Sequence, residues 1–203
     1  MKIVKICGIT KPHETEYILE ACPDLAGIVR FYEKSRRCTG SETARELVRL
    51  MKGIKTVAVT VRPTSEQIKA VVDEGFDYVQ IHGDVSDEVL YGSKLPVIKA
   101  FNVSDLSGFE RYERCRNVAG YIFDAHTPGS GIRLEQKDIE AIPLSAKFRM
   151  LAGGLDPDNV AEALRMSGLD GADTSSGVEN NSGTGKDRDK IIRFVDIVKG
   201  RCL

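Results

Sequence analysis

The sequence predicts an α/β protein of the TIM (β/α)8-barrel class, folded as a single domain over residues 1–203. One unit recurs eight times along the chain: a short β-branched or apolar run, a polar or glycine-rich turn, and a segment with helical spacing. Strands that alternate with helices make right-handed crossovers and a parallel sheet, and eight units allow that sheet to close. A chain of 203 residues can bury the core of one such domain, and no linker or low-complexity tract divides it.

Each predicted strand is a short apolar or β-branched run that leads into a turn. Apolar and polar residues alternate, as in a strand, from the first residues of the chain. The eight predicted strands are, in chain order, Ile3–Cys7, 26–30, 55–60, 77–81, 96–100, 119–123, 148–151 and Gly171–Thr174.

Helical spacing of apolar residues is clearest after strands one, two, three, seven and eight. The predicted helices are 13–21, 41–51, Ser65–Asp73, 156–166 and 187–199. In the seventh unit Asp156 is the expected N-cap, and Pro157 suits the first helical position. The segments after strands four, five and six are brief or weakly helical, because a chain this short must use tight connections to complete a barrel.

The charge balance gives the chain no general attraction to polyanions. Lysine and arginine number 29 against 30 aspartates and glutamates, for a formal net charge of −1. We therefore predict neither nucleic acid nor a membrane as a partner, so any recognition of an anion must be local. The five cysteines form no Cys-x-x-Cys pair, and the first residues contain no apolar leader. A soluble protein of the reducing cytoplasm fits best.

Neither a metal nor an organic cofactor is predicted. The three histidines, His13, His82 and His126, are scattered, and no carboxylate joins them at a metal-ligand spacing. No Gly-x-Gly-x-x-Gly fingerprint follows the first strand, so a dinucleotide is also unsupported.

Glycines and serines after strands seven and eight predict a phosphate site. Gly153 and Gly154 follow strand seven, and Ser175, Ser176 and Gly177 follow strand eight. Glycine lets backbone N–H groups approach an anion, a helix that begins there adds a favourable dipole, and serine adds hydroxyl donors. Either motif alone is more often an ordinary turn, but phosphate sites in barrels occur at this joint position.

Motifs along nearly the whole chain resemble one family. They are Lys-Ile-Cys-Gly-Ile-Thr at 5–10, Phe-Tyr-Glu-Lys-Ser-Arg-Arg at 31–37, Val-Gln-Ile-His-Gly at 79–83, Ile-Lys-Ala at 98–100, Asp124 with Pro-Gly-Ser-Gly at 128–131, Leu-Ala-Gly-Gly-Leu-Asp-Pro-Asp-Asn-Val at 151–160, and Asp-Thr-Ser-Ser-Gly-Val-Glu at 173–179 with Lys-Asp at 186–187. In this order the motifs resemble those of the phosphoribosylanthranilate isomerase family. So many matches in register are not plausibly a coincidence.

The resemblance implies an Amadori rearrangement in tryptophan biosynthesis, which turns N-(5'-phosphoribosyl)anthranilate into 1-(2-carboxyphenylamino)-1-deoxyribulose 5-phosphate. It implies Asp124 as the general acid and Cys7 as the general base. Strands one and six lie three steps apart around an eight-membered ring, so these groups can face each other across its mouth. From the residues alone, a cysteine that ends an apolar strand is usually a small core residue.

Further substrate contacts are expected from other strand ends. The resemblance implies that Arg37 pairs with the anthranilate carboxylate, although Arg36 beside it leaves the choice open and a solvated basic patch is the competing interpretation. His82 ends strand four and could point into the site. Gly129 and Gly131 belong to a segment whose composition is typical of a lid that closes over a substrate.

Some positions depart from the family pattern. His126 stands where relatives carry lysine, Arg-Leu-Glu-Gln at 133–136 replaces an aromatic region, and Arg30 occupies a usually apolar position. Two alternatives therefore stay open: a related phosphate-binding barrel enzyme with an altered phosphosugar substrate, and a non-catalytic binder of a phosphoribosyl ligand. The sequence does not choose between a monomer and a homodimer.

Overall fold

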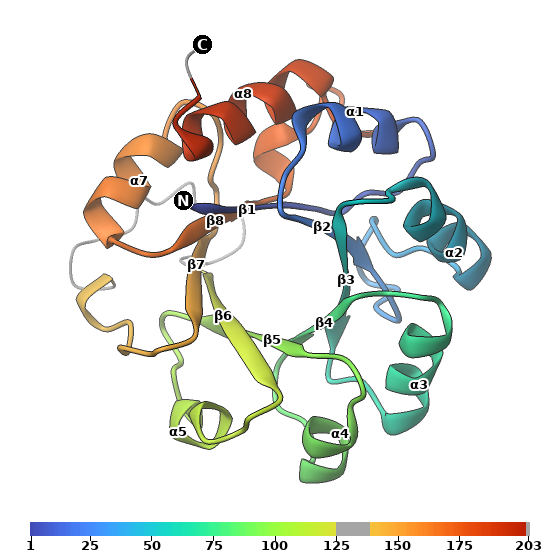
Figure 1. The fold of residues 1–203 in the computed structure, drawn as a ribbon, viewed down its shortest axis with the longest axis vertical. Coiled ribbons are helices and arrows are strands. Elements are labelled where there is room, and N and C mark those ends of the chain that lie inside the picture. The colour runs from blue at the N-terminus through green and yellow to red at the C-terminus, as the bar shows by residue number, and fades with distance from the viewer. Residues whose placement is uncertain (125–138, 202–203) are drawn as a thin grey trace.

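Eight parallel strands close into a barrel in the order in which they occur in the chain, in a computed structural model that describes residues 1–124 and 139–201. Helices surround the ring of strands on its outside (Figure 1). The predicted (β/α)8 class is thereby confirmed. The strands are β1 Ile3–Cys7, β2 Leu25–Val29, β3 Lys55–Val61, β4 Tyr78–His82, β5 Val97–Asn102, β6 Val118–Asp124, β7 Phe148–Ala152 and β8 Gly171–Thr174.

The helices follow the predicted positions, and the two after β4 and β5 are as short as expected. They are α1 Glu14–Ala21, α2 Ser41–Leu50, α3 Ser65–Asp73, α4 Asp87–Gly92, α5 Phe109–Glu113, α7 Val160–Ser167 and α8 Arg188–Lys199, with a 3-10 turn η1 at Ser176–Val178. Helix α3 starts with a capping box, since Thr64 and Gln67 each accept a hydrogen bond from the other's backbone N–H.

The start of the seventh helix differs from the prediction. Helix α7 begins at Val160 with Asn159 as its N-cap, so the assignment of Asp156 to that position is wrong. The Asp156 carboxylate instead accepts hydrogen bonds from the backbone N–H of Asp158 at 2.8 Å and of Asn159 at 3.0 Å. The aspartate thus stabilises the turn before the helix, because that turn presents the first unpaired N–H groups.

Two apolar cores hold the barrel together. The outer core lies between strands and helices and includes Val4, Ile6, Leu47 and Phe194. The inner core fills the barrel with alternate strand residues such as Leu25, Val57, Ile98, Ile122 and Met150. Because neighbouring residues of a strand point to opposite sides, strands such as β3 and β5 contribute to both cores. The barrel interior is packed, so an active site is expected at the carboxyl ends of the strands.

Candidate active site

Cys7 and Asp124 both lie at the carboxyl end of the barrel, as predicted. Cys7 is the last residue of β1 and belongs to the inner core. Asp124 is the last residue of β6 and lies two positions after Ile122, so it stands on the same inner side of the sheet. β7 and β8 are the strands between β6 and β1. The two groups therefore occupy separated positions on the rim of one mouth.

Arg37 reaches the same mouth from the loop after β2. Its side chain crosses Gly8, the residue after Cys7, and a Cβ on Gly8 would collide with the Arg37 Cδ atom. Gly8 also has a φ of +80°, in the left-handed region that favours glycine. The glycine thus lets the arginine lie directly against the end of β1.

Glu179, which follows η1, pairs with both arginines of the β2 loop. One of its oxygens, Oε1, accepts a hydrogen bond from Arg37 Nε at 2.6 Å, and Oε2 pairs with Arg36. Burial alone raises the pKa of the Glu179 carboxyl, but the hydrogen bond from Arg37 and the charges of Lys186 and the arginines bring it below its usual value. Glu179 is therefore an anion near neutral pH.

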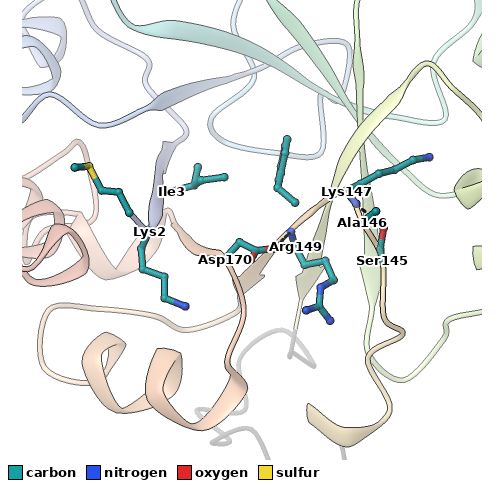
Figure 2. A pocket seen from close by; sticks show the side chains of 9 residues that line it. Lys2, Ile3, Ser145, Ala146, Lys147, Arg149 and Asp170 are labelled. Atoms are coloured by element: carbon teal, nitrogen blue, oxygen red, sulfur yellow. Dashed lines mark hydrogen bonds between the residues drawn. The ribbon is translucent and has the colours of Figure 1, made fainter.

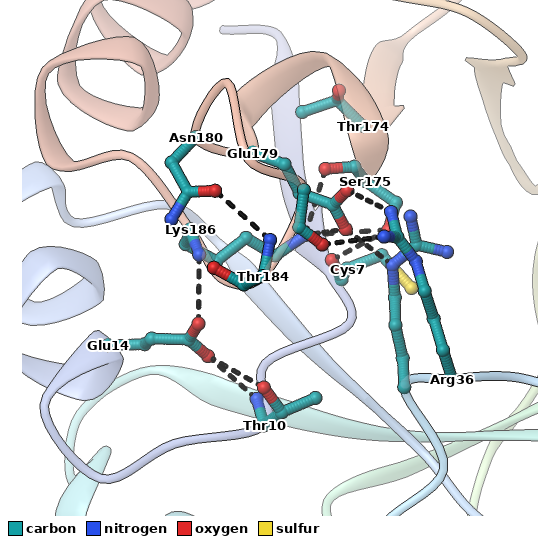
Figure 3. Close-up of polar contacts among 12 residues, drawn as sticks. Cys7, Thr10, Glu14, Arg36, Thr174, Ser175, Glu179, Asn180, Thr184 and Lys186 are labelled. Carbon is teal, nitrogen blue, oxygen red and sulfur yellow. Dashed lines mark hydrogen bonds and ion pairs between the residues drawn. The ribbon is translucent and has the colours of Figure 1, made fainter.

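Lys186 is a buried cation beside the same group. Its ammonium donates to the Ser175 carbonyl at 2.8 Å and lies 3.8 Å from Glu179 Oε1 (Figure 3). Burial lowers the pKa of Lys186 to about 8, while the nearby Cys7 and Glu179 act in the opposite direction. A cation whose pKa lies near neutral pH thus stands close enough to Cys7 for the two charges to interact.

Glu14 joins the loops that carry these residues. This carboxylate, in α1, is fully buried. One oxygen accepts the backbone N–H of Thr10 at 2.7 Å and of Lys11 at 3.1 Å, and the other accepts the backbone N–H of Lys186 at 2.8 Å. The loops after β1 and β8 are therefore fixed to each other by one buried group, as Figure 3 shows.

The loops after β7 and β8, predicted to hold phosphate, are in contact. A Cβ on Gly177 would collide with the carbonyl oxygen of Leu155, and the Thr174 hydroxyl donates to that oxygen at 2.6 Å. Gly153 and Gly154 both have positive φ, at 98° and 64°. Open space lies where a Gly154 side chain would be.

The two predicted serine donors differ in their present partners. Ser175 donates its hydroxyl proton to the Cys7 carbonyl at 3.1 Å, so it links β8 to β1. Ser176 is exposed and begins the turn η1. Of the pair, Ser176 is the more accessible to a ligand.

His82 ends β4 and is partly buried among cations. Burial first, and then the positive charges of Lys5 and Lys99, lower the pKa of His82 to about 4. One ring nitrogen lies 2.7 Å from the Gln80 amide nitrogen. The imidazole is neutral near pH 7, so it can serve there as a hydrogen-bonding group and not as a cation.

A buried ion pair lies below Cys7 inside the barrel. Lys5 Nζ is 3.0 Å from Asp173 Oδ1, and the pair joins β1 to β8. Lys5 is completely buried. A Cβ on Gly27 would lie 3.0 Å from Cys7 Sγ and 3.1 Å from Lys5 Nζ, so the thiol and the ammonium occupy one region.

Sequence reasoning assigned no role to Glu179 or Lys186, although both stand in matched motifs. The available signal was a carboxylate just after Ser-Ser-Gly, in a loop expected at the same rim as two adjacent arginines. Gly129, Gly131 and His126 lie outside the described residues.

A cavity of about 600 Å3 lies at the opposite end of the barrel (Figure 2). Lys2, Arg149 and Asp170 line it, near the first residues of β1, β7 and β8. Barrel enzymes bind substrates at the carboxyl ends of their strands, so this cavity is not the candidate active site. Among the described residues, no cluster of three His, Cys, Asp or Glu side chains could hold a metal ion, and no helix there is long and apolar enough to cross a membrane.

The fold is a closed (β/α)8 barrel, and one rim carries a thiol, a carboxyl group, an arginine and last loops rich in glycine and serine. These features are typical of barrel proteins that hold a phosphorylated small molecule. The chain belongs to the N-(5'-phosphoribosyl)anthranilate (PRA) isomerase family, whose model matches residues 4–197. The resemblance seen in the sequence is thereby confirmed.

Individual relatives extend over the whole chain. The N-(5'-phosphoribosyl)anthranilate isomerase of Geotalea uraniireducens is 39% identical over 208 residues, which cover 98% of this chain and 100% of the relative. The crystal structure of phosphoribosyl anthranilate isomerase from Thermotoga maritima matches with a TM-score of 0.83 and 32% identity over 98% of this chain and 100% of that one. A structure of the enzyme in complex with reduced 1-(o-carboxyphenylamino)-1-deoxyribulose 5-phosphate matches with a TM-score of 0.79 and 31% identity over 98% and 100%.

Proposed function

We propose that this chain is an aldose–ketose isomerase that converts N-(5'-phosphoribosyl)anthranilate into 1-(2-carboxyphenylamino)-1-deoxyribulose 5-phosphate, a step of tryptophan biosynthesis. Membership of the family supports the reaction. The observation that carries the assignment to residues is the placement of Cys7 and Asp124 on the inner rim of one barrel mouth. The proposed setting is a single cytoplasmic domain.

The reaction needs one acid and one base. Protonated Asp124 gives its proton to the ring oxygen while the bond from C1 to that oxygen breaks, and the nitrogen lone pair forms a Schiff-base cation. The Cys7 thiolate then takes the proton from C2, and the electrons of the C–H bond form the C1–C2 double bond of an enolamine. The enolamine tautomerises to the ketone with one proton added at C1 and one lost from the C2 hydroxyl. Transfer of the proton from the Cys7 thiol to the Asp124 carboxylate through solvent then restores both groups for the next cycle.

The two ends of the substrate meet different parts of the mouth. The loops at Gly153–Gly154 and Ser175–Gly177 hold the phosphate through backbone N–H groups and the exposed Ser176 hydroxyl. Arg37 pairs with the anthranilate carboxylate. Gly129 and Gly131 belong to the loop proposed to cover the substrate, and His82 offers a neutral hydrogen-bonding group.

The experiment follows the fluorescence of chemically generated N-(5'-phosphoribosyl)anthranilate, which falls on isomerisation. We expect Cys7→Ala and Asp124→Asn each to reduce kcat by about 100-fold or more, with substrate binding retained. Cys115→Ala is the matched control, since Cys115 is also a buried free cysteine but lies after α5, away from the rim. Binding without turnover by the wild-type protein would instead support the non-catalytic binder, and turnover of a different phosphosugar would support the altered enzyme.

Oligomeric state is a separate proposal. One matched structure is described as mutually generated monomers of the dimeric enzyme from Thermotoga maritima, at a TM-score of 0.79 and 30% identity. A monomer and a homodimer are the two proposed states, since that description names both for the Thermotoga maritima enzyme. Analytical ultracentrifugation decides between them.

A further inference from the structure

Glu179 is a buried carboxylate surrounded by three cations. Its side chain is only 9% exposed. Arg36 and Arg37 reach it from the loop after β2, and Lys186 approaches from the loop before α8. The contacts with the arginines span more than a hundred residues of sequence. A group so placed sets the positions of its partners, because moving one of them would leave a buried charge unpaired.

The two arginines bind this carboxylate in different ways. Arg36 is 58% exposed and uses both terminal nitrogens, one on Glu179 and one on the Gly183 carbonyl. Arg37 is 23% exposed and donates to Glu179 through Nε at 2.6 Å. Over the described parts of the chain, the two terminal nitrogens of Arg37 make no hydrogen bond. Both terminal nitrogens of Arg36 thus bind other protein groups, while those of Arg37 remain available to bind a ligand.

The Arg37 side chain lies near the predicted reaction centre. The Arg37 side chain crosses Gly8, next to Cys7 in the chain. Ser175 Oγ links the neighbouring groups, since it lies 3.5 Å from Lys186 Nζ and donates to the Cys7 carbonyl at 3.1 Å. A Cβ on Gly8 would meet both this oxygen and Arg37 Cδ. A planar guanidinium bound through Nε can still offer its two terminal nitrogens to a second carboxylate in a bidentate pair.

We propose that Glu179 is a positioning residue that aims Arg37 at the carboxylate of the substrate, with Arg36 as a brace on the opposite oxygen. This inference rests on the proposed function. It also assigns the two neighbouring arginines different tasks. Without the anion, Arg36, Arg37 and Lys186 repel one another, and the Arg37 fork loses its fixed direction.

The test compares two substrates that differ only in the group Arg37 would bind. One is N-(5'-phosphoribosyl)anthranilate, and the other is N-(5'-phosphoribosyl)aniline, which lacks the carboxylate. For each protein we measure kcat/KM with both substrates and take the ratio of the value for the anthranilate to the value for the aniline. We expect Glu179→Gln to lower this ratio by about 10-fold or more, chiefly through a higher KM for the anthranilate, with little change for the aniline. A merely structural defect would reduce kcat/KM for both substrates alike and leave the ratio unchanged.

A matched control and a double variant complete the design. Glu20→Gln removes a carboxylate that also accepts from an arginine Nε, that of Arg188 at 2.8 Å, but on the exposed surface of α1, and it should leave the ratio unchanged. In an Arg37→Ala background, Glu179→Gln should have no further effect on the ratio. If Glu179→Gln alone does not fold, Glu179→Gln with Lys186→Met removes the unpaired ammonium and takes its place.

The outcomes separate this inference from the function beneath it. A ratio that survives Glu179→Gln, or that falls further when Arg37 is already alanine, overturns the positioning role. A ratio unchanged in Arg37→Ala overturns the assignment of Arg37 itself and the inference with it. A wild-type protein that turns over neither substrate overturns the proposed function.

Discussion

Gly8 is the residue on which the position of Arg37 depends. A methyl group there would meet Arg37 Cδ, and the φ of +80° is unfavourable for any other residue. We expect Gly8→Ala to raise KM for the anthranilate substrate about 10-fold and to destabilise the fold by about 1–3 kcal/mol. Steady-state kinetics and urea unfolding measure the two effects. Gly40→Ala is the control, because it has open space around it and a φ of −72°; a comparable loss there would remove the explanation.

His82 gives stability a dependence on pH. Its pKa is lowered to about 4 in the fold, against about 6.5 in an unfolded chain. Between these values the unfolded state holds the proton and the folded state does not, so stability falls as pH falls through this window, by about 3 kcal/mol in total. Urea unfolding of wild type and His82→Gln from pH 7 to pH 4 gives the difference. Equal slopes for the two proteins would contradict this prediction.

The sequence identified the candidate functional residues that stand in short motifs of the family. Cys7, Asp124 and Arg37 were assigned because each stands in a motif of the family, and each lies at the expected rim. Glu179 and Lys186 received no role, because their importance lies in contacts between loops far apart in the chain. Nothing local in the sequence shows that one carboxylate meets two arginines 142 and 143 positions earlier.

At the scale of elements, the strands were located from apolar runs to within two residues, since burial on both faces of a barrel strand leaves a strong pattern. The start of α7 was misplaced because Asp156 and Pro157 are good helix-initiating residues that here serve a preceding turn. The turn η1 was not anticipated, because three residues carry too short a pattern.

The loops after β7 and β8 act as one unit through the contact at Gly177. We expect Gly177→Ala to push these loops apart, because a Cβ would collide with the Leu155 carbonyl oxygen. Inhibition by inorganic phosphate should weaken about 10-fold, if the loops hold phosphate together. Gly168→Ala, at the other end of α7, has open space and a positive φ of 63°, so it should lose some stability but keep phosphate affinity. Equal inhibition by phosphate in the wild type, Gly177→Ala and Gly168→Ala would argue against a phosphate site shared by the two loops.

The barrel closes where β8 pairs with β1, and the stability of the whole molecule depends on this contact. Lys5 and Asp173 form a buried ion pair across this contact. We expect Asp173→Asn to reduce the free energy of unfolding by about 3–5 kcal/mol, because it leaves a buried ammonium without its counterion. Replacing both residues, as Lys5→Met with Asp173→Leu, should recover much of that loss. Chemical denaturation of the three proteins tests this, and a double variant less stable than Asp173→Asn would contradict it.

The bond between Arg37 and Glu179 also has a consequence for the order of events during synthesis. A chain made from its amino end exposes Cys7 and Arg37 early, but the partner of Arg37 emerges 142 residues later. Until then the arginine fork has no fixed direction and β1 has no β8 beside it. Binding competence should therefore arise in one late step, so a ribosome-bound nascent chain that stops before residue 171 should bind no substrate, however many of its early helices have formed.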